Sequence, residues 1–419
     1  MEKHTRLTAR RKENRKKLCI FFCNPLYDTT IMTRLRRFLA VCHGEKPDYV
    51  PIFGHPWAPG MSGGCLKTTY DHLRRSGMPD VGGGWDPAHL DQFNLQGWAD
   101  YWGTDSPMEL NFFPGQGGPG IRSQRTVRDG FEFIEYDTGA LTRQYIDNDI
   151  SYGMPDFIRY HVRDRESFEH YKALNSPTAP WATEQIAQAC LPYANRTRPL
   201  WVMLHSSWGA LRGTMGPEAA CTVLYDDPEL AEEFLEWLRW INREFLFPLI
   251  RQLKPEAVIV GEDFCYNHGM FISAEHFNRF CAPTYREIGE VVKAAGVPAF
   301  VIDSDGFVEP ALPLVVPLGV NALLPWEVKA GNDLDRVRDR YPELIMFGGI
   351  EKESVNAGNT AMIRPVIDAK RPLIRGGRYF PNGDHGLQSV VDFENLCKFM
   401  TRLHEVTENP EGTFPRMQP

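Results

Sequence analysis

The chain has 419 residues, of which 42% are hydrophobic and 24% are charged. This composition is typical of globular proteins and excludes a disordered or coiled-coil chain, and the length allows one large domain or two modest ones. No apolar run approaches the roughly 20 residues of a membrane helix, and the N-terminus lacks a hydrophobic signal core. We therefore expect a cytoplasmic protein without a membrane partner.

The charge is unevenly distributed. The formal net charge is −8, but residues 1–17 hold eight Lys or Arg and two Glu, a local +6, which leaves −14 on the remaining chain. An acidic body argues against a nucleic-acid enzyme. We interpret residues 1–30 as a basic N-terminal extension, either a solvated terminus or a contact for an acidic partner. The nine cysteines include no CxxC pair, so no disulfide framework or zinc ribbon is predicted.

From residue 199 onwards, short apolar runs alternate with helix-period segments, a pattern typical of parallel βα units. Strands are predicted at residues 199–205, 257–261, 299–302, 320–324, 344–347 and 378–380. Asp227 before Pro228, Ser273 and Asp392 each predict the start of a helix, the last one over residues 393–406. With an early strand at residues 49–53, these units favour an α/β fold of the TIM (β/α)8 barrel type over a doubly wound sheet.

Residues 54–160 are rich in Gly, Pro, Trp and Asp and are too long for an ordinary connection. We interpret them as an elaborated insertion in a single barrel domain spanning residues 31–419, and we expect the insertion to lie over the C-terminal mouth. Its aromatic residues either line a pocket or form a small satellite core; they are Trp57, Trp85, Trp98, Tyr101 and Trp102. The glycine runs in this region neither follow a strand nor open a helix, so no nucleotide site is predicted.

Polar residues follow nearly every predicted strand. These stretches are His205-Ser206-Ser207-Trp208, Glu262-Asp263-Phe264-Cys265-Tyr266, Asp303-Ser304-Asp305-Gly306, Pro325-Trp326-Glu327, Gly348-Gly349-Ile350-Glu351 and Asn382-Gly383-Asp384-His385-Gly386. In a barrel, strand ends meet at one mouth, so several carboxylates and two imidazoles would converge there. Helix capping explains a single acid, but it does not explain acids after successive strands.

We expect one pocket to be lined by Asp263, Asp303, Asp305, Glu327 and His385. Such a cluster can act as general acid and base, or it can bind a metal through carboxylate oxygens and a His385 nitrogen. The pattern does not decide between these chemistries. His205, Trp208 and Tyr266 are candidate substrate contacts, with a structural role as the alternative.

Motifs at these positions resemble the uroporphyrinogen decarboxylase superfamily, which includes corrinoid-linked methyltransferases. The similarity starts within residues 33–40 and 44–51, resumes at residues 154–155 and 162–166, and continues through later strand ends. The later motifs are Asp303-Ser304-Asp305-Gly306, Leu324-Pro325-Trp326-Glu327, Gly348-Gly349-Ile350, Gly376-Gly377 and Asp384-His385. The resemblance implies a TIM barrel.

Two departures from the superfamily pattern narrow the implied activity. The loop at residues 54–61 lacks the arginines that bind porphyrinogen carboxylates, which argues against haem-pathway decarboxylation. The zinc ligands of thiol-methylating relatives, a His-x-Cys pair, a Glu and a Cys, fall here on Asp303, Asp305, Glu327 and a position near His385. An oxygen-rich set suits a hard Lewis acid or proton chemistry better than thiol activation, which argues against coenzyme M methylation.

The resemblance therefore implies transfer of a methyl group from a small methoxylated or N-methylated substrate to a corrinoid protein. Asp263, Asp303, Asp305 and His385 would be the catalytic groups, with zinc on Asp303, Glu327 and His385 as an alternative. A second hypothesis is a decarboxylase or lyase for a small acid, with a carboxylate clamp formed by Arg122, Arg143 or Arg159. A third is a non-enzymatic binding barrel. The sequence does not fix the oligomeric state, for which a homodimer is one option.

Overall fold

The computed structural model describes residues 32–53, 64–85, 95–110, 121–146, 155–177 and 183–419. Its largest sheet has seven parallel strands in the order β15-β14-β13-β12-β9-β8-β3. In chain order the strands are β3 (Met108–Glu109), β8 (Leu200–Met203), β9 (Ala257–Gly261), β12 (Ala299–Asp303), β13 (Ala322–Leu324), β14 (Ile345–Ile350) and β15 (Tyr379–Gly383). The six strands predicted after residue 199 are thus all confirmed.

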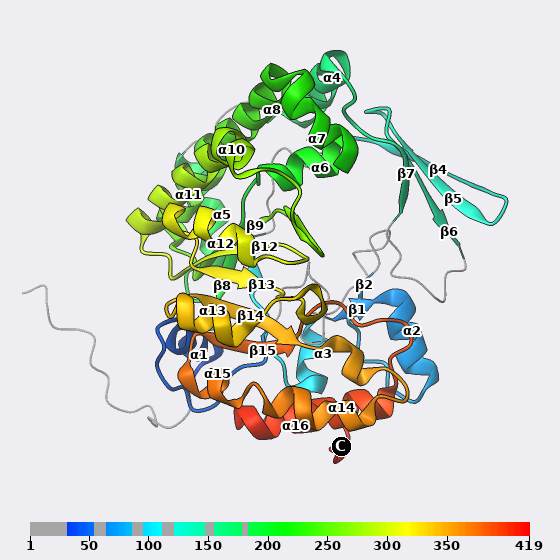
Figure 1. Cartoon of the computed structure of the whole chain (residues 1–419), viewed down its shortest axis with the longest axis vertical. Helices are drawn as coiled ribbons and strands as arrows, with labels where there is room; N and C mark the ends of the chain where they lie inside the picture. Colours follow the sequence, from blue (N-terminus) through cyan, green and yellow to red (C-terminus); the bar gives the residue numbers. More distant parts are fainter. Residues whose placement is uncertain (1–31, 54–63, 86–94, 111–120, 147–154, 178–182) are drawn as a thin grey trace, which may run out of the picture.

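The sheet curls around an apolar interior. One buried cluster combines inward-facing residues from β8, β9, β12, β13, β14 and β15 with Phe38 and Phe53. The Phe53 ring lies 5.4 Å from Trp201 on β8 and 5.7 Å from Phe380 on β15, measured between ring centroids, so strands near opposite ends of the sheet contact the same cluster. The strand predicted at residues 49–53 is not formed: this segment has no regular strand, and Phe53 makes one isolated parallel bridge with Asp105. The architecture is TIM-barrel-like (Figure 1).

Helices cover the outside of the sheet (Figure 1). They are α4 (Arg165–Asn175), α5 (Thr183–Cys190), α6 (Trp208–Met215), α7 (Pro217–Asp226), α8 (Pro228–Ile241), α9 (Phe247–Leu253), α10 (Ala274–His276), α11 (Ala282–Ala295), α12 (Leu312–Val315), α13 (Leu334–Arg340), α14 (Thr360–Asp368), α15 (Arg371–Gly376) and α16 (Phe393–Thr407). Asp227, Ser273 and Asp392 accept backbone N–H bonds as the N-caps of α8, α10 and α16, as predicted. No helix in the described ranges is long and apolar enough to cross a membrane.

The region predicted as an insertion is more structured than the sequence suggested. It contains β1 (Cys65–Leu66), α2 (Lys67–Arg75), β2 (Gly84–Trp85) and α3 (Leu95–Trp102). It also contributes β3 to the parallel sheet, which was not predicted. A separate antiparallel sheet follows, with β4 (Ser123–Arg128), β5 (Phe131–Tyr136), β6 (Leu141–Tyr145) and β7 (Asp156–Arg159). Figure 1 shows this sheet standing beside α6 and α7, and the Val162 N–H donates to the Thr214 carbonyl at 3.1 Å.

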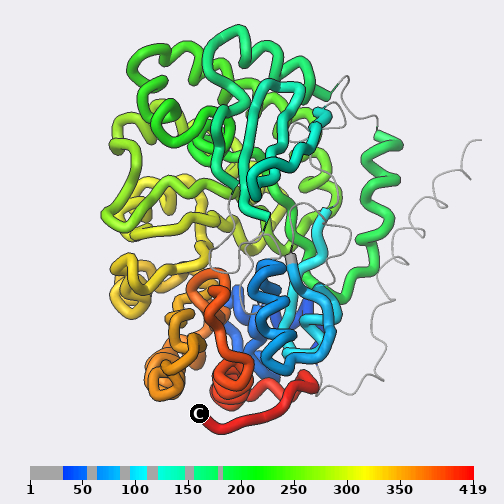
Figure 2. Tube along the Cα trace, turned by 90° about the vertical axis from the view of Figure 1, so that its right-hand side faces the viewer, coloured from blue at the N-terminus to red at the C-terminus, as the bar shows by residue number. Residues whose placement is uncertain are grey.

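The aromatic residues of α3 form a satellite core rather than a pocket wall. Trp98, Tyr101 and Trp102 are buried, and Trp102 contacts the rings of Phe393 and Phe414. Figure 2 shows the C-terminal segment running beside α3, although the two are far apart in sequence, and the Thr413 N–H donates to the Tyr101 carbonyl at 2.8 Å. The Trp57 chain segment and the Trp85 side chain lie outside the described residues.

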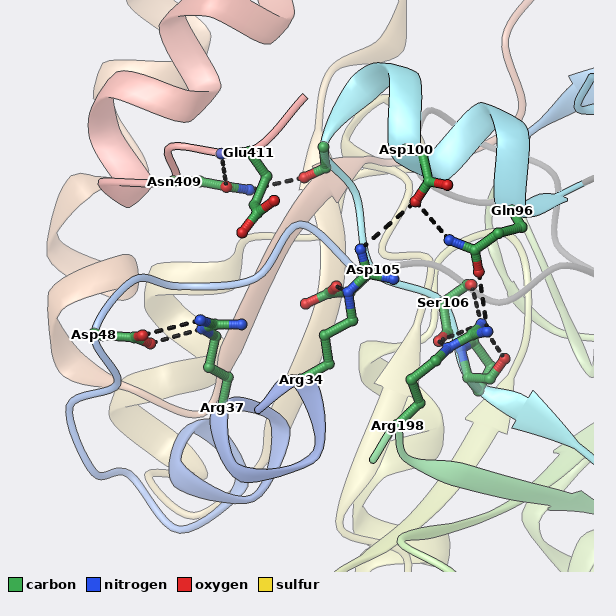
Figure 3. Close-up of polar contacts among 12 residues, drawn as sticks. Arg34, Arg37, Asp48, Gln96, Asp100, Asp105, Ser106, Arg198, Asn409 and Glu411 are labelled. Atoms are coloured by element: carbon green, nitrogen blue, oxygen red, sulfur yellow. Dashed lines mark hydrogen bonds and ion pairs between the residues drawn. The ribbon is translucent and has the colours of Figure 1, made fainter. Parts of the chain in front are cut away.

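Helix α1 (Arg34–Cys42) lies against the amino ends of the parallel strands, opposite the strand ends predicted to carry the site. The Leu35 N–H donates to the Thr197 carbonyl ahead of β8, and the Arg378 N–H ahead of β15 donates to the Val41 carbonyl. Polar contacts around α1 are drawn in Figure 3. They join Arg37 to Asp48, Arg34 to Asp105 at 2.9 Å, and Arg198 to Ser106.

Candidate active site

The strand-end loops bring four predicted residues together. Asp303 is the last residue of β12, and its carbonyl accepts the backbone N–H groups of Glu262 and Asp263. The Asp305 N–H donates to Asp263 Oδ1 at 3.1 Å, and His385 Nε2 lies 3.1 Å from Asp305 Oδ1. Three strands thus place Asp263, Asp303, Asp305 and His385 in one group, hereafter the acid cluster.

The members of the acid cluster hold their protons differently. Burial, together with the charges of Asp263 and Asp305, raises the pKa of Asp303 well above its usual range. Burial and the charge of Asp305 likewise raise the pKa of Asp263. Burial opposes ionisation of Asp305, but the hydrogen bond and charge of His385 lower the Asp305 pKa. Burial would lower the pKa of His385, yet its hydrogen bond to Asp305 raises it. These directions favour a neutral Asp303 and an ionised Asp305 beside a protonated His385.

Two cations that were not predicted complete the cluster. The Arg212 guanidinium on α6 donates to Asp263 Oδ2, and Lys352 Nζ lies 3.3 Å from Glu327 Oε1. Lys352 is the second residue after β14, so a search of the residues that follow each strand could have identified it. Arg212 lies inside α6, so a rule that considers only the residues directly after each strand does not include it.

Glu327 and Asp384 tie neighbouring loops together. Glu327 Oε2 accepts the Gly306 N–H at 2.8 Å, and the Asp384 carboxylate accepts the backbone N–H groups of Val328 and Lys352, each at 2.9 Å. Glu327 also contributes to the raised pKa of His385 through its charge. The loops after β13, β14 and β15 are therefore fixed relative to one another.

The predicted zinc ligands do not fit a metal site as they are placed. Within the described ranges, no group of three or more His, Cys, Asp or Glu side chains could hold a metal ion. Glu327 pairs with Lys352, and His385 directs Nε2 at Asp305. This arrangement gives no support to zinc on Asp303, Glu327 and His385, which nothing here tests directly, and no chemical step is derived from it.

Glu262 anchors the loop that precedes α6. Its buried carboxylate accepts bonds from the Ser207 N–H at 2.9 Å, the Gly209 N–H at 2.7 Å and the Tyr285 hydroxyl at 2.8 Å. A side chain at Gly209 would place its Cβ only 2.2 Å from the Gly261 carbonyl oxygen. Glu262 thus has a structural role that fixes the backbone next to Asp263.

The three predicted substrate contacts have different surroundings. His205 is buried, and its backbone exchanges two hydrogen bonds with the Asn242 side chain. Trp208 is also buried and donates its indole N–H to the Asp263 carbonyl at 3.2 Å. Tyr266 is exposed on the hairpin of β10 (Cys265–Tyr266) and β11 (Gly269–Met270). Only Tyr266 presents a ring to solvent, and substrate contact by any of the three stays a prediction.

The arginines proposed as a carboxylate clamp lie on or beside the antiparallel sheet. Arg122 is 3.6 Å from Asp137, Arg143 pairs with Asp156, and Arg159 is 3.1 Å from Glu135. Each guanidinium is already engaged by a local carboxylate. Residues 54–61, on which the argument against porphyrinogen binding depended, lie outside the described residues.

The fold and sequence define the class of this protein. Its sequence matches the family described as uroporphyrinogen decarboxylase (URO-D) over residues 149–406, more than half of the chain. The chain belongs to this family. No curated protein matches the sequence.

Among solved structures, the chain is similar to a methyltransferase from Methanosarcina mazei. The identity is 12%, the match covers 90% of this chain and 99% of that one, and the TM-score is 0.56, which supports a shared fold. A putative α-galactosidase/melibiase from Bacteroides fragilis has 8% identity, coverage of 87% and 61%, and a TM-score of 0.30. A β-L-arabinopyranosidase from Geobacillus stearothermophilus has 9% identity, coverage of 89% and 78%, and a TM-score of 0.27. The last two similarities are too low to support an argument.

Proposed function

We propose that this protein is an enzyme that transfers a methyl group from a small methoxylated or N-methylated compound to a corrinoid carried by a partner protein. The observation that carries the proposal is the pairing of His385 with Asp305 beside Asp303 at the carboxyl ends of two parallel strands, β12 and β15. The URO-D family membership and the fold shared with a methyltransferase support it. The corrinoid is a second substrate here, and it supplies the reduced metal centre that accepts the methyl group.

The acid cluster can supply the proton that demethylation of an ether requires. An alkoxide is a poor leaving group, so the leaving oxygen must be protonated as its bond to the methyl carbon breaks. His385 holds a proton because of its bond to Asp305, and Asp305 orients the imidazole through Nε2. After the transfer, the demethylated product leaves with this proton and solvent restores it to His385.

Asp303 and Asp263 affect the electrostatic potential around the His385–Asp305 pair. A neutral Asp303 adds no negative charge beneath the reacting group, and Arg212 balances Asp263. The developing negative charge on the leaving oxygen therefore meets a local environment that contains a protonated imidazole and a guanidinium.

The test combines purified protein, reduced corrinoid protein and a panel of methoxyaromatic, methylamine and carboxylic-acid substrates. Methylation of the corrinoid is followed by absorbance, and CO₂ release is measured separately. We expect methyl transfer that falls by about 100-fold or more in His385→Ala, the size typical of losing a general acid. His43→Ala, at the exposed end of α1 on the opposite side, is the matched control. CO₂ release without methyl transfer would instead support the decarboxylase or lyase hypothesis.

A further inference from the structure

The antiparallel sheet has one strand edge that the rest of the described chain leaves open. β4 pairs with β5 on one side, and no other strand within the described ranges pairs with its second side. Every residue of β4 is exposed, and Figure 1 shows the β4–β5 hairpin projecting away from the barrel. In an antiparallel ladder, alternate residues of an edge strand direct their N–H and C=O groups away from the neighbouring strand. β4 therefore offers main-chain hydrogen bonds to a further strand over roughly 20 Å.

Three arginines lie along this open side, and we call them the arginine edge: Arg122, Arg125 and Arg128. Arg122 is 3.6 Å from Asp137, but its side chain is 89% exposed. Arg125 is 3.5 Å from Glu132. Arg128 packs its guanidinium 4.3 Å from the centroid of the Phe133 ring and forms no ion pair with the residues that the structure describes. Long ion pairs at the surface contribute little free energy, so all three cations can pair with a further anion.

An exposed apolar side chain lies between two of these arginines. Val127 is 67% exposed, and its partner on β5 is Glu132. Residues directly opposite each other in an antiparallel pair lie on the same face of the sheet, with their Cβ atoms about 5 Å apart. A strand added along β4 would therefore cover Val127 with one of its own side chains.

We propose that the arginine edge binds an acidic, extended segment of a partner protein, which continues the sheet as an antiparallel strand beside β4. Side chains alternate between the two faces of a strand, so Arg125 lies on one face and Arg122 and Arg128 lie on the other. Carboxylates three residues apart in the added strand would stand opposite the three arginines, and opposite charges across a strand pair attract. Main-chain hydrogen bonds hold the segment, and the charges select its sequence.

A second copy of this chain fits the arginine edge less well. Two copies paired through β4 would carry arginines on both strands, and like charges across a strand pair repel. Nucleic acid also fits less well. Glu132 and Glu135 lie on β5, directly behind the edge, and they interrupt the positive surface that phosphate contacts require.

Peptide binding to the full chain tests the proposal. The probe is a fluorescein-labelled peptide of sequence Glu-Val-Thr-Glu-Thr-Thr-Glu, whose acids match the spacing of the arginine edge, and binding is followed by fluorescence anisotropy. A second peptide has lysine in place of each glutamate, and we expect it to bind about 10-fold or more weakly, because three cross-strand attractions become repulsions.

Two further peptides test the main-chain hydrogen bonds. Both keep the acidic sequence, and each is N-methylated at every second residue, one at the odd positions and one at the even positions. Only one of these sets of N–H groups faces β4 in an added strand. We expect one methylated peptide to bind like the parent and the other to bind about 10-fold or more weakly. Binding by charge alone would tolerate both.

Variants locate the binding surface. Arg125→Glu combined with Arg128→Glu is expected to weaken binding of the acidic peptide by about 10-fold or more and to favour the lysine peptide, with Arg125→Gln and Arg128→Gln together giving an intermediate loss. The matched control is Arg165→Glu combined with Arg279→Glu, which changes the net charge equally at two exposed, ion-paired arginines outside the sheet. Circular dichroism verifies folding.

Several results would overturn the proposal. They are no binding of the acidic peptide, equal binding of the lysine peptide, tolerance of both methylated peptides, and unchanged affinity in the Arg125 and Arg128 variants. Self-association of the chain that these variants abolish would assign the edge to a second copy instead. Tighter binding of a single-stranded oligonucleotide than of the acidic peptide would assign it to nucleic acid.

Discussion

Asp105 lies in the polar cluster at the amino ends of the strands, shown in Figure 3, and its protonation is predicted to control stability near neutral pH. Its side chain is 7% exposed, and burial raises its pKa from 3.8 to about 6, against the opposing charges of Arg34, Arg37 and Arg198. Arg34 pairs with Oδ1 at 2.9 Å, while Oδ2 is buried without a hydrogen-bond donor in the described ranges. The ion pair therefore compensates only part of the cost of burying the carboxylate.

The direction of the pH dependence of stability follows because the pKa of Asp105 is higher in the folded state than in the unfolded state. Protonation of Asp105 stabilises the fold fully below about pH 3.8, and this contribution is lost as the pH rises through about 6. A shift of this size corresponds to about 3 kcal/mol in total, of which about 2 kcal/mol falls between pH 4.5 and pH 7.5. Asp105→Asn cannot ionise, so it is expected to lack this component of the pH dependence.

The assay is urea unfolding followed by tryptophan fluorescence at several pH values in this window. The measured quantity is the change in unfolding free energy with pH, compared between wild type and Asp105→Asn. Asp100→Asn is the control, because Asp100 is 3.8 Å from the same Arg34 but its side chain is 61% exposed. We expect this control to follow wild type within about 0.5 kcal/mol. A pH dependence unchanged in Asp105→Asn would refute the reasoning.

Three further predictions concern the site. Asp305→Asn removes the group that raises the pKa of His385, so His385 should lose its proton at a lower pH in an NMR titration, and an unchanged titration would contradict the pairing. Glu262→Ala leaves the donors of the α6 loop without an acceptor and should lower the free energy of unfolding in urea by about 3 kcal/mol. The control is Glu232→Ala at an exposed ion pair, which should lower it by less than about 1 kcal/mol. Gly306→Ala should cost about 1–3 kcal/mol more than Gly130→Ala, because both have positive φ but only Gly306 meets backbone atoms; equal costs would contradict the close packing.

The strands that could be predicted from the sequence are those with continuous buried apolar residues. β9 and β14 are nearly all buried, and such continuous apolar runs are visible without a structure. β3 has two residues within a Gly- and Pro-rich stretch, too short to give a pattern. β4 is exposed at every position, so it shows no alternation. The Asp129-Gly130 pair between β4 and β5, both with positive φ, was a hairpin signal that sequence reasoning missed.

The candidate site was predictable to the extent that barrel topology determines it. Strand ends bring Asp263, Asp303, Asp305 and His385 together, because parallel strands end at one edge. The same rule could not show that Glu262 points into the α6 loop, since side-chain direction depends on the local backbone. Nor could it find Arg212, whose position depends on how α6 packs on the loop after β9.

The charges of the site explain why proton chemistry suits these residues. With Asp303 neutral, the negative charges of Asp263, Asp305 and Glu327 are each matched by a positive partner, respectively Arg212, His385 and Lys352. A divalent cation at this place would have to displace Lys352 or remove protons from His385 and Asp303, and each change breaks an existing pair. A proton can move within the cluster and leave the other pairs intact. This pattern of charges supports the proposed role of the acid cluster as a general acid.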